Sequence, residues 1–148
     1  MLILYTQASE IERRIAAENL HAYWQRRGLP HDLAWAKDYL RIGHGKDVVS
    51  DQFFIYRTRD FAGLVALVEQ EGGVAEIREE IVFVREASFC AMITELIHYA
   101  REKRLRKVFS CALAERVSHY TSLGFVPEGV LRSHFKEGED LTIMSKFL

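Results

Sequence analysis

Three acidic residues lie within a run that otherwise favours a β-strand. The run covers Val74–Val84 and reads VAEIREEIVFV. Glu76, Glu79 and Glu80 interrupt its apolar and β-branched residues. A carboxylate held among apolar neighbours has a raised pKa, which suits a general base at neutral pH. The alternative is that all three are surface carboxylates paired with neighbouring arginines. The run therefore offers groups for proton transfer, with both interpretations open.

The helix that follows this run begins with a candidate phosphate site. A helix N-terminus beyond the carboxyl end of a strand presents free N–H groups and the positive end of the helix dipole. Ser88 is in position to cap this helix. The alternative is a packed strand–helix–strand crossover that holds no ligand. The apolar stripe of the helix recurs at helical spacing and consists of Phe89, Met92, Ile93, Leu96, Ile97 and Ala100.

The histidines, cysteines and short glycine motif do not combine into a recognisable site. The six histidines and two cysteines lack the H-x3-H, HExxH and CxxC spacings of metal ligands, so no metal is expected. The stretch GHGK at residues 43–46 lacks the long glycine-rich spacing of a phosphate loop and the Ser or Thr that follows it. We predict a turn there.

The amino-acid composition limits the classes of protein to which the chain can belong. The chain has 148 residues, 49% of them hydrophobic, and 20 Lys+Arg against 21 Asp+Glu give a formal net charge of −1. This length and apolar content predict a single domain over residues 1–148. The balanced charge argues against a protein that coats nucleic acid. The apolar runs fall short of the ~20 residues of a membrane helix, and the start lacks the features of a secretory signal. We therefore expect a cytoplasmic protein without nucleic-acid or membrane partners.

The elements that must position these groups alternate between strands and helices. Ser9 and Glu12 have the spacing of a capping box at the start of the first helix. Asp32 can cap a second helix, and Gly124 can end a short late one. The predicted strands are Leu2–Thr6, Phe53–Arg59, Leu64–Glu69, Val74–Val84, Lys107–Leu113, Phe125–Lys136 and Leu141–Leu148, with a turn at Asp60 and Gly63. The predicted helices are Ile11–Arg27, Asp32–Ile42, Ser88–Ala100 and Glu115–Ser122.

This order of elements predicts the fold class. A strand–helix–strand crossover in the middle favours one parallel pair of strands, and antiparallel hairpins lie on both sides of it. We therefore predict an α/β (α+β) fold with a central mixed sheet of about seven strands flanked by about four helices.

The last third of the chain carries a motif that resembles a known family. Residues 120–125 read YTSLGF, in the pattern Y-x-x-L-G-F, and the hairpin after them contains Glu-Gly-x-x-Arg. This arrangement resembles the C-terminal third of the GNAT N-acetyltransferase superfamily. The predicted order of elements is similar to the fold of that family along the whole chain.

The resemblance implies transfer of an acetyl group from acetyl-CoA to a primary amine of a small molecule or a peptide. In that family two central strands part, the pantetheine arm pairs with their backbone, and the pyrophosphate lies at the N-terminus of the next helix. The two strands correspond to Val74–Val84 and Lys107–Leu113. The resemblance implies contacts with CoA at Phe83, Val84, Arg85, Ala87, Ser88 and Phe89, the last three through their backbone amides.

The resemblance also implies two catalytic residues. Tyr120 falls on the family tyrosine that protonates the departing thiolate. A phenol with an ordinary pKa near 10 is protonated for that task at neutral pH. Glu80 begins the residues EIVF, which look like the stretch that bears the catalytic glutamate in histone-acetylating members. Its implied role is to take a proton from the amine.

One segment departs from the family's pattern and keeps two other functions open. The family's phosphate loop reads Gln/Arg-x-x-Gly-x-Gly/Ala, whereas residues 84–92 read VREASFCAM and contain no glycine. Ala87 and Phe89 stand where the glycines belong. One alternative is a GNAT-fold binding or regulatory module without catalysis. The other is an α+β interaction domain without a CoA site, which pairs through the edge of its hairpin at Phe125–Leu148.

Aromatic residues are frequent in the segments that set acceptor specificity in the GNAT fold, namely the first two helices and the terminal hairpin. They are equally typical of an acceptor pocket with apolar walls, of an ordinary core and of an interface between two copies of the chain. These residues are Tyr23, Trp24, Trp35, Tyr39 and Phe135.

Overall fold

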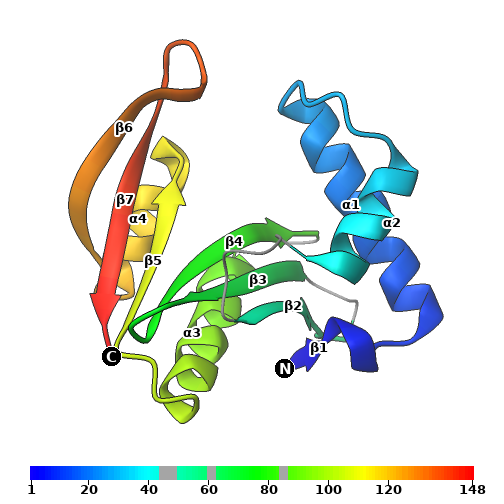
Figure 1. The fold of residues 1–148 in the computed structure, drawn as a ribbon, viewed down its shortest axis with the longest axis horizontal. Helices are drawn as coiled ribbons and strands as arrows, with labels where there is room; N and C mark the ends of the chain where they lie inside the picture. Colours follow the sequence, from blue (N-terminus) through cyan, green and yellow to red (C-terminus); the bar gives the residue numbers. More distant parts are fainter. Residues whose placement is uncertain (44–49, 60–62, 84–86) are drawn as a thin grey trace.

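The computed structural model describes residues 1–43, 50–59, 63–83 and 87–148 and arranges them on one seven-stranded sheet (Figure 1). The strand order is β1-β2-β3-β4-β5-β7-β6, with β4 and β5 parallel and the other neighbours antiparallel. The predicted α/β class, the parallel pair and the order of elements are confirmed, and a short 3-10 helix, η1, is added after β1. The elements are β1 (Leu2–Leu4), η1 (Tyr5–Gln7), α1 (Glu10–Arg26), α2 (Leu33–Ile42), β2 (Ser50–Tyr56), β3 (Gly63–Gln70), β4 (Val74–Val82), α3 (Ala87–Glu102), β5 (Lys107–Ala112), α4 (Ala114–Ser122), β6 (Val126–Lys136) and β7 (Glu139–Phe147).

Helices cover both faces of the sheet. The buried residues of α1 and α2 pack on one face, and those of α3 and α4 pack on the other (Figure 1). The alternation of side chains along a strand divides neighbouring residues between these two clusters. On β2, for example, Phe53 joins the α1–α2 cluster and Phe54 joins the α3–α4 cluster.

Local signals in the sequence determine several helix ends. The Ser9 hydroxyl accepts the N–H of Glu12 at 3.3 Å, and the Glu12 carboxylate accepts the N–H of Ser9 at 2.8 Å. The predicted capping box is therefore confirmed. The Asp32 carboxylate accepts the N–H of Trp35 at 2.8 Å, as predicted for the start of α2. Gly124, with a φ of 80°, follows the end of α4 in the left-handed region that favours glycine.

Two local predictions were wrong. The helix α3 begins at Ala87, so Ser88 is its second residue and not its cap. Gly63 is the first residue of β3 and not part of a turn. A Cβ added there would lie 2.8 Å from a main-chain carbonyl oxygen of β4, so close packing explains this glycine. Asp60 and residues 44–46, which belong to predicted turns, lie outside the described residues.

A β-bulge in β4 determines which of its carboxylates faces α3 and α4. The register between β3 and β4 shifts here, so that one residue of β3 lies opposite both Glu79 and Glu80. Glu79 has a φ of 52°, in the left-handed region. Ile77 packs in the α3–α4 cluster and Ile81 in the α1–α2 cluster, although regular alternation would place both on one face. The extra residue therefore turns Glu80 toward the α3–α4 side.

The parallel strands β4 and β5 pair only at their beginnings. The pairing joins residues 74–76 of β4 to residues 107–109 of β5. Both strands continue beyond these positions, to Val82 and Ala112. The sheet is thus open between its two central strands, as the resemblance implies, and main-chain groups on both sides of the opening are available to an extended ligand.

Candidate active site

Glu80 lies where β4 and β5 part, and one of its oxygens accepts two hydrogen bonds. Its Oε1 accepts from the Ser110 hydroxyl at 2.9 Å and from the Tyr120 hydroxyl at 3.2 Å. Ser110 and Tyr120 are buried, and Glu80 is half-buried. The structure therefore brings the two predicted catalytic residues, Glu80 and Tyr120, into direct contact although 40 positions separate them.

The elements around this contact hold each side chain in place. Ser110 lies on β5, among the alternate residues of that strand that face α3 and α4. Tyr120 projects from α4, and its ring meets Phe89 and Phe125 edge to face at centroid distances of 5.5 and 4.9 Å. Because the ring is confined by these two neighbours, its hydroxyl is directed at Glu80.

Burial shifts the pKa values of Glu80 and Tyr120 so that the two residues suit different proton-transfer roles. Burial raises the pKa of Glu80 to about 7, and the hydrogen bond from Ser110 opposes the rise. Burial also raises the pKa of Tyr120 well above its usual value of 10, and the negative charge of Glu80 raises it further. At neutral pH, Glu80 therefore exchanges a proton readily, whereas Tyr120 keeps its proton and is available as a donor.

The other two acidic residues of β4 have different partners. The Glu76 carboxylate lies 2.6 Å from the Arg78 guanidinium. The Glu79 carboxylate accepts a hydrogen bond from the Tyr39 hydroxyl of α2 at 2.9 Å. Glu76 is thus paired with an arginine, as the alternative proposes, but it is buried and not on the surface. Glu80 instead accepts from two hydroxyls in surroundings that raise its pKa, as suits a general base.

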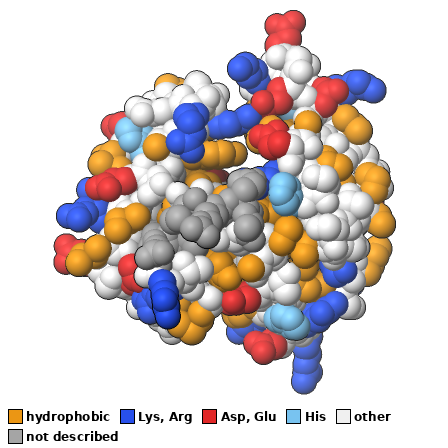
Figure 2. Space-filling model, turned by 180° about the vertical axis from the view of Figure 1, so that it is seen from behind, with side chains coloured by type: hydrophobic (Ala, Val, Ile, Leu, Met, Phe, Trp, Pro, Cys, Tyr) orange, Lys and Arg blue, Asp and Glu red, His pale blue; other side chains and the backbone are white. Residues whose placement is uncertain are grey.

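An ion pair joins α1 to the terminal hairpin on the side of the sheet where Glu79 lies. Arg27 donates two hydrogen bonds to Glu139, one of them from Nη1 to Oε2 at 2.6 Å. Burial raises the pKa of the nearby Tyr23 to about 12, and the negative charge of Glu80 adds to the rise. Figure 2 shows a hollow between two lobes of the molecule, bordered by basic and acidic side chains.

The residues predicted to contact CoA are only partly described. Val84 and Arg85 lie outside the described residues, and Phe83 packs against the α1–α2 cluster. Ala87, Ser88 and Phe89 are the first three residues of α3, so their N–H groups have no acceptor within the helix. The resulting row of amides is a suitable site for an anion.

Phe89 stands where the family has a glycine, but its side chain does not cover its own backbone amide. The Phe89 side chain is fully buried and points into the α3–α4 cluster. The guanidinium of Arg116, on α4, lies 4.3 Å from the centre of the Phe89 ring, which places a positive charge beside the first turn of α3. An anion at these amides would meet the positive end of the helix dipole.

Sequence reasoning did not identify Ser110 or Arg116 as parts of this site. Ser110 lies in an ordinary apolar strand, and Arg116 is one cation among many in the second half of the chain. Tyr23 is one of the aromatic residues whose frequency in the sequence suits an acceptor pocket, a core or an interface equally well. No spacing within the sequence links these residues, because the site forms only where separate elements meet.

Substituting Ser110 by alanine is expected to raise the pKa of Glu80 further. The Ser110 hydroxyl stabilises the ionised carboxylate, and losing a hydrogen bond to a charged group changes a pKa by about one unit. Carboxyl-carbon NMR titration of the wild type and of Ser110→Ala measures the change. Ser145→Ala is the matched control, because this buried serine donates to Glu128 instead. An unchanged Glu80 titration in Ser110→Ala would show that the hydroxyl does not support the carboxylate.

Neither a metal-binding cluster nor a membrane-spanning helix is found in the described part of the chain. Within it, no group of three or more His, Cys, Asp or Glu side chains is arranged to hold a metal ion. None of the described helices has the length and apolar character needed to span a membrane.

Known proteins share this fold but not this sequence. No family model matches the chain, and none of the curated proteins matches it in sequence. The spermidine N-acetyltransferase of Vibrio cholerae, solved with CoA and spermine, superposes with a TM-score of 0.79 at 18% identity, covering 99% of this chain and 94% of that one. An aminoglycoside 6'-N-acetyltransferase, solved with coenzyme A, gives 0.79 at 10% identity, covering 99% and 96%. A putative GNAT acetyltransferase of Desulfovibrio desulfuricans gives 0.72 at 18% identity, covering 99% and 98%. The chain therefore has the fold of the GNAT acetyltransferases.

Proposed function

We propose that this chain is a single-domain, cytoplasmic N-acetyltransferase of the GNAT type. Its donor is acetyl-CoA, and its acceptor is a primary amine of a small molecule or a peptide. The observation that carries the proposal is the contact of Glu80 with Tyr120 where β4 and β5 part. Proteins of the same fold support it, since two of them are named for acetylating spermidine and aminoglycosides, which are amines.

The two residues divide the reaction into proton removal and proton delivery. Acetyl-CoA supplies the thioester that carries the acetyl group. Glu80 takes a proton from the ammonium form of the acceptor, and the neutral amine forms a C–N bond with the acetyl carbon. As the C–S bond breaks, Tyr120 gives its proton to the departing sulfur. The amide nitrogen loses its second proton to water, so one proton is released for each acetyl group transferred.

The hydrogen bond between the two residues closes the proton cycle. After donation Tyr120 is a phenolate, and its oxygen faces the Oε1 atom of Glu80. Glu80 holds the proton taken from the amine and can return it to Tyr120 over this short distance. The phenolate is the stronger base because the pKa of Tyr120 is far above that of Glu80. Both residues then regain their starting protonation states without exchange with bulk water.

Thermal unfolding with acetyl-CoA tests the donor. Acetyl-CoA at 100 times its dissociation constant is expected to stabilise the fold by ~2.7 kcal/mol. ATP is the control ligand, because it carries phosphates and adenine but no pantetheine arm to pair with β4 and β5. No stabilisation by acetyl-CoA, CoA or longer acyl-CoAs would contradict the proposal and favour an interaction domain.

Release of CoA with a panel of amines tests the transfer itself. The panel contains spermidine, an aminoglycoside, and peptides with a free amino terminus or a lysine. CoA release with at least one of these classes is the expected result. Stabilisation by acetyl-CoA without CoA release from any of them would favour the alternative of a binding or regulatory module.

A further inference from the structure

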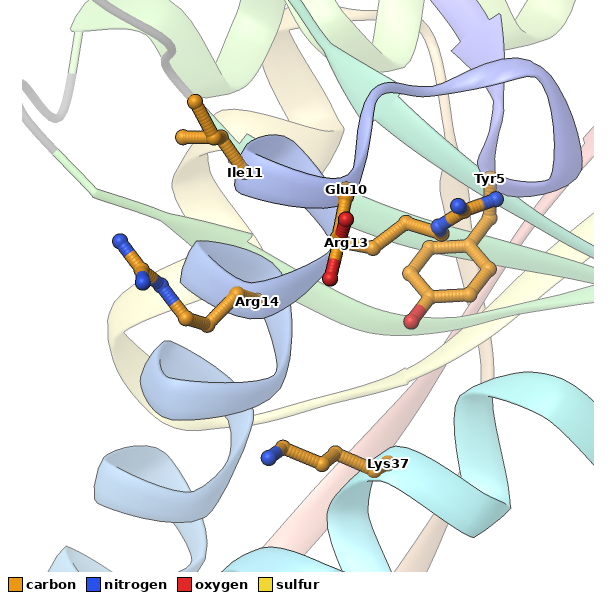
Figure 3. Close-up of a pocket in the computed structure, with 6 residues that line it drawn as sticks. All are labelled: Tyr5, Glu10, Ile11, Arg13, Arg14 and Lys37. Atoms are coloured by element: carbon orange, nitrogen blue, oxygen red, sulfur yellow. The ribbon is translucent and has the colours of Figure 1, made fainter.

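The hollow between α1 and α2 is open surface and not a formed binding site. Its volume is about 540 Å³, but its three cations point in different directions and a carboxylate lies among them (Figure 3). Most of its lining is exposed. These charged residues are Glu10, Arg13, Arg14 and Lys37. On its other side, α2 contacts the sheet through the hydroxyl of Tyr39.

Either of two adjacent carboxylates of β4 could face α3 and α4. A regular strand would direct Glu79 to that side and Glu80 to the other. The β-bulge reverses this order, so the Glu80 carboxylate meets the hydroxyls of Ser110 and Tyr120. The Glu79 carboxylate lies on the opposite face, toward α1 and α2. Which of the two residues faces Tyr120 therefore depends on what keeps the bulge in place.

The reversed order requires an unfavourable backbone conformation. Glu79 has a φ of 52°, in the left-handed region, which costs free energy for a residue that has a Cβ atom. The Tyr39 hydroxyl donates to the Glu79 carboxylate at 2.9 Å. Hydrogen bonds to a carboxylate are stronger than those between neutral groups. Because this bond forms only while Glu79 points toward α2, it offsets the cost of the left-handed conformation.

Aromatic neighbours hold the Tyr39 ring in one orientation. Trp35 stacks on the ring at a centroid distance of 5.5 Å, and Trp24 and Phe53 each meet it edge to face at 5.4 Å. Trp24 and Phe53 are themselves buried. Burial raises the pKa of Tyr39 well above its usual value of 10, and the charge of Glu79 adds to the rise, so the hydroxyl keeps the proton that it donates. The cluster therefore directs a hydroxyl donor at β4.

We propose that Tyr39 is a positioning residue that selects Glu80, and not Glu79, as the base. Its hydroxyl holds Glu79 on the face of the sheet that α1 and α2 cover. This contact stabilises the bulge that turns Glu80 toward Ser110 and Tyr120. The inference rests on the proposed function, because it concerns the residue that takes a proton from the amine.

Carboxyl-carbon NMR titration of Glu80 tests the contact without requiring turnover. In the wild type, Ser110→Ala is expected to raise the pKa of Glu80 by about one unit, because the carboxylate loses a donor. In the Tyr39→Phe background the same substitution is expected to shift this pKa by less than about half as much, since Glu80 then turns away from Ser110. Tyr99→Phe is the matched control background. It removes a tyrosine hydroxyl that donates to Gln52 and is expected to keep the full shift.

Steady-state kinetics separate positioning from binding of the acceptor. Tyr39→Phe is expected to lower kcat at least about tenfold, the factor equivalent to one hydrogen bond to a charged group, and to leave KM for the amine within about threefold. Glu79→Gln keeps an acceptor for the Tyr39 hydroxyl and is expected to retain kcat within about threefold. Glu79→Ala is expected to lower kcat as far as Tyr39→Phe does. Combining Tyr39→Phe with Glu79→Ala should cause no further loss.

Three results would overturn the proposal. The first is an equal shift of the Glu80 titration by Ser110→Ala in the wild-type and Tyr39→Phe backgrounds. The second is an equal loss of kcat in Glu79→Gln and Glu79→Ala, because Glu79 would then act through its charge. The third is a rise in KM alone in Tyr39→Phe, because Tyr39 would then contact the acceptor.

Two provisions keep the test decisive. If Tyr39→Phe does not fold, Glu79→Ala removes the same hydrogen bond and replaces it in the titrations. A wild type that releases no CoA with any amine would refute the proposed function, whereas the titrations would still decide whether Tyr39 positions Glu80.

Discussion

Replacing Tyr120 by phenylalanine is expected to lower kcat by about 10²–10⁴, the usual contribution of a general acid. The substitution removes the hydroxyl that donates to Glu80 and keeps the ring that packs between Phe89 and Phe125. The free energy of unfolding is expected to fall by only ~1 kcal/mol, the net value of one hydrogen bond. Steady-state kinetics and urea unfolding of the same preparation measure both quantities.

Tyr56→Phe is the matched control for this prediction. Tyr56 is buried in the same α3–α4 cluster, but no hydrogen bond links it to Glu80. Its hydroxyl can therefore be removed without touching the proposed proton path, and kcat is expected to stay within about twofold of the wild type. If an active wild type and Tyr120→Phe turn over at equal rates, Tyr120 is a core residue and not the acid.

The fold could be predicted because its signals are local. The capping box at Ser9 depends only on residues within one turn of α1. The stripe from Phe89 to Ala100 depends only on the period of a helix. The ends of individual strands are predicted less accurately. The strand β2, for example, begins at Ser50 and not at Phe53. Strand ends depend on pairing partners, which lie far away in the sequence.

The choice among the three carboxylates of β4 depended on a feature that the sequence does not display. Regular alternation from Ile77 would direct Glu79 toward α3 and α4 and Glu80 away from them. The bulge reverses this order, and it arises from the pairing of β4 with β3 and not from the residues VAEIREEIVFV themselves. The resemblance to a family pointed to Glu80, but physical reasoning about the strand alone could not.

Replacing Glu80 by glutamine is expected to lower kcat/KM by about 10²–10⁴ at pH 8 and to change its dependence on pH. The base acts in its ionised form, so the wild-type rate should rise with pH through the pKa of Glu80, about 7. Glutamine cannot ionise, yet its carbonyl oxygen still accepts from Ser110 and Tyr120. The variant should therefore lose the inflection near pH 7. Glu79→Gln, which alters the neighbouring carboxylate, is expected to keep it.

The same substitution is expected to stabilise the fold at high pH and not at low pH. The pKa of Glu80 is raised from 4.5 to about 7 on folding, so its ionisation is less favourable in the folded chain than in the unfolded one. Below pH 4.5 the carboxyl group is protonated in both the folded and the unfolded chain, so its ionisation does not lower the free energy of unfolding. Between pH 4.5 and 7 the cost grows, and above pH 7 it is complete, at up to about 3 kcal/mol for a shift of this size.

Urea unfolding at pH 4 and pH 8 measures this difference. Glu80→Gln should match the wild type at pH 4 and exceed its free energy of unfolding at pH 8. Glu79→Gln removes a charge that raises the pKa of Glu80 and should give only a smaller gain. An equal stability difference at the two pH values would show that Glu80 does not titrate near neutrality. Greater stability at pH 8 together with slower acetylation would instead mean that the fold keeps an unfavourable buried charge because the proton transfer requires it.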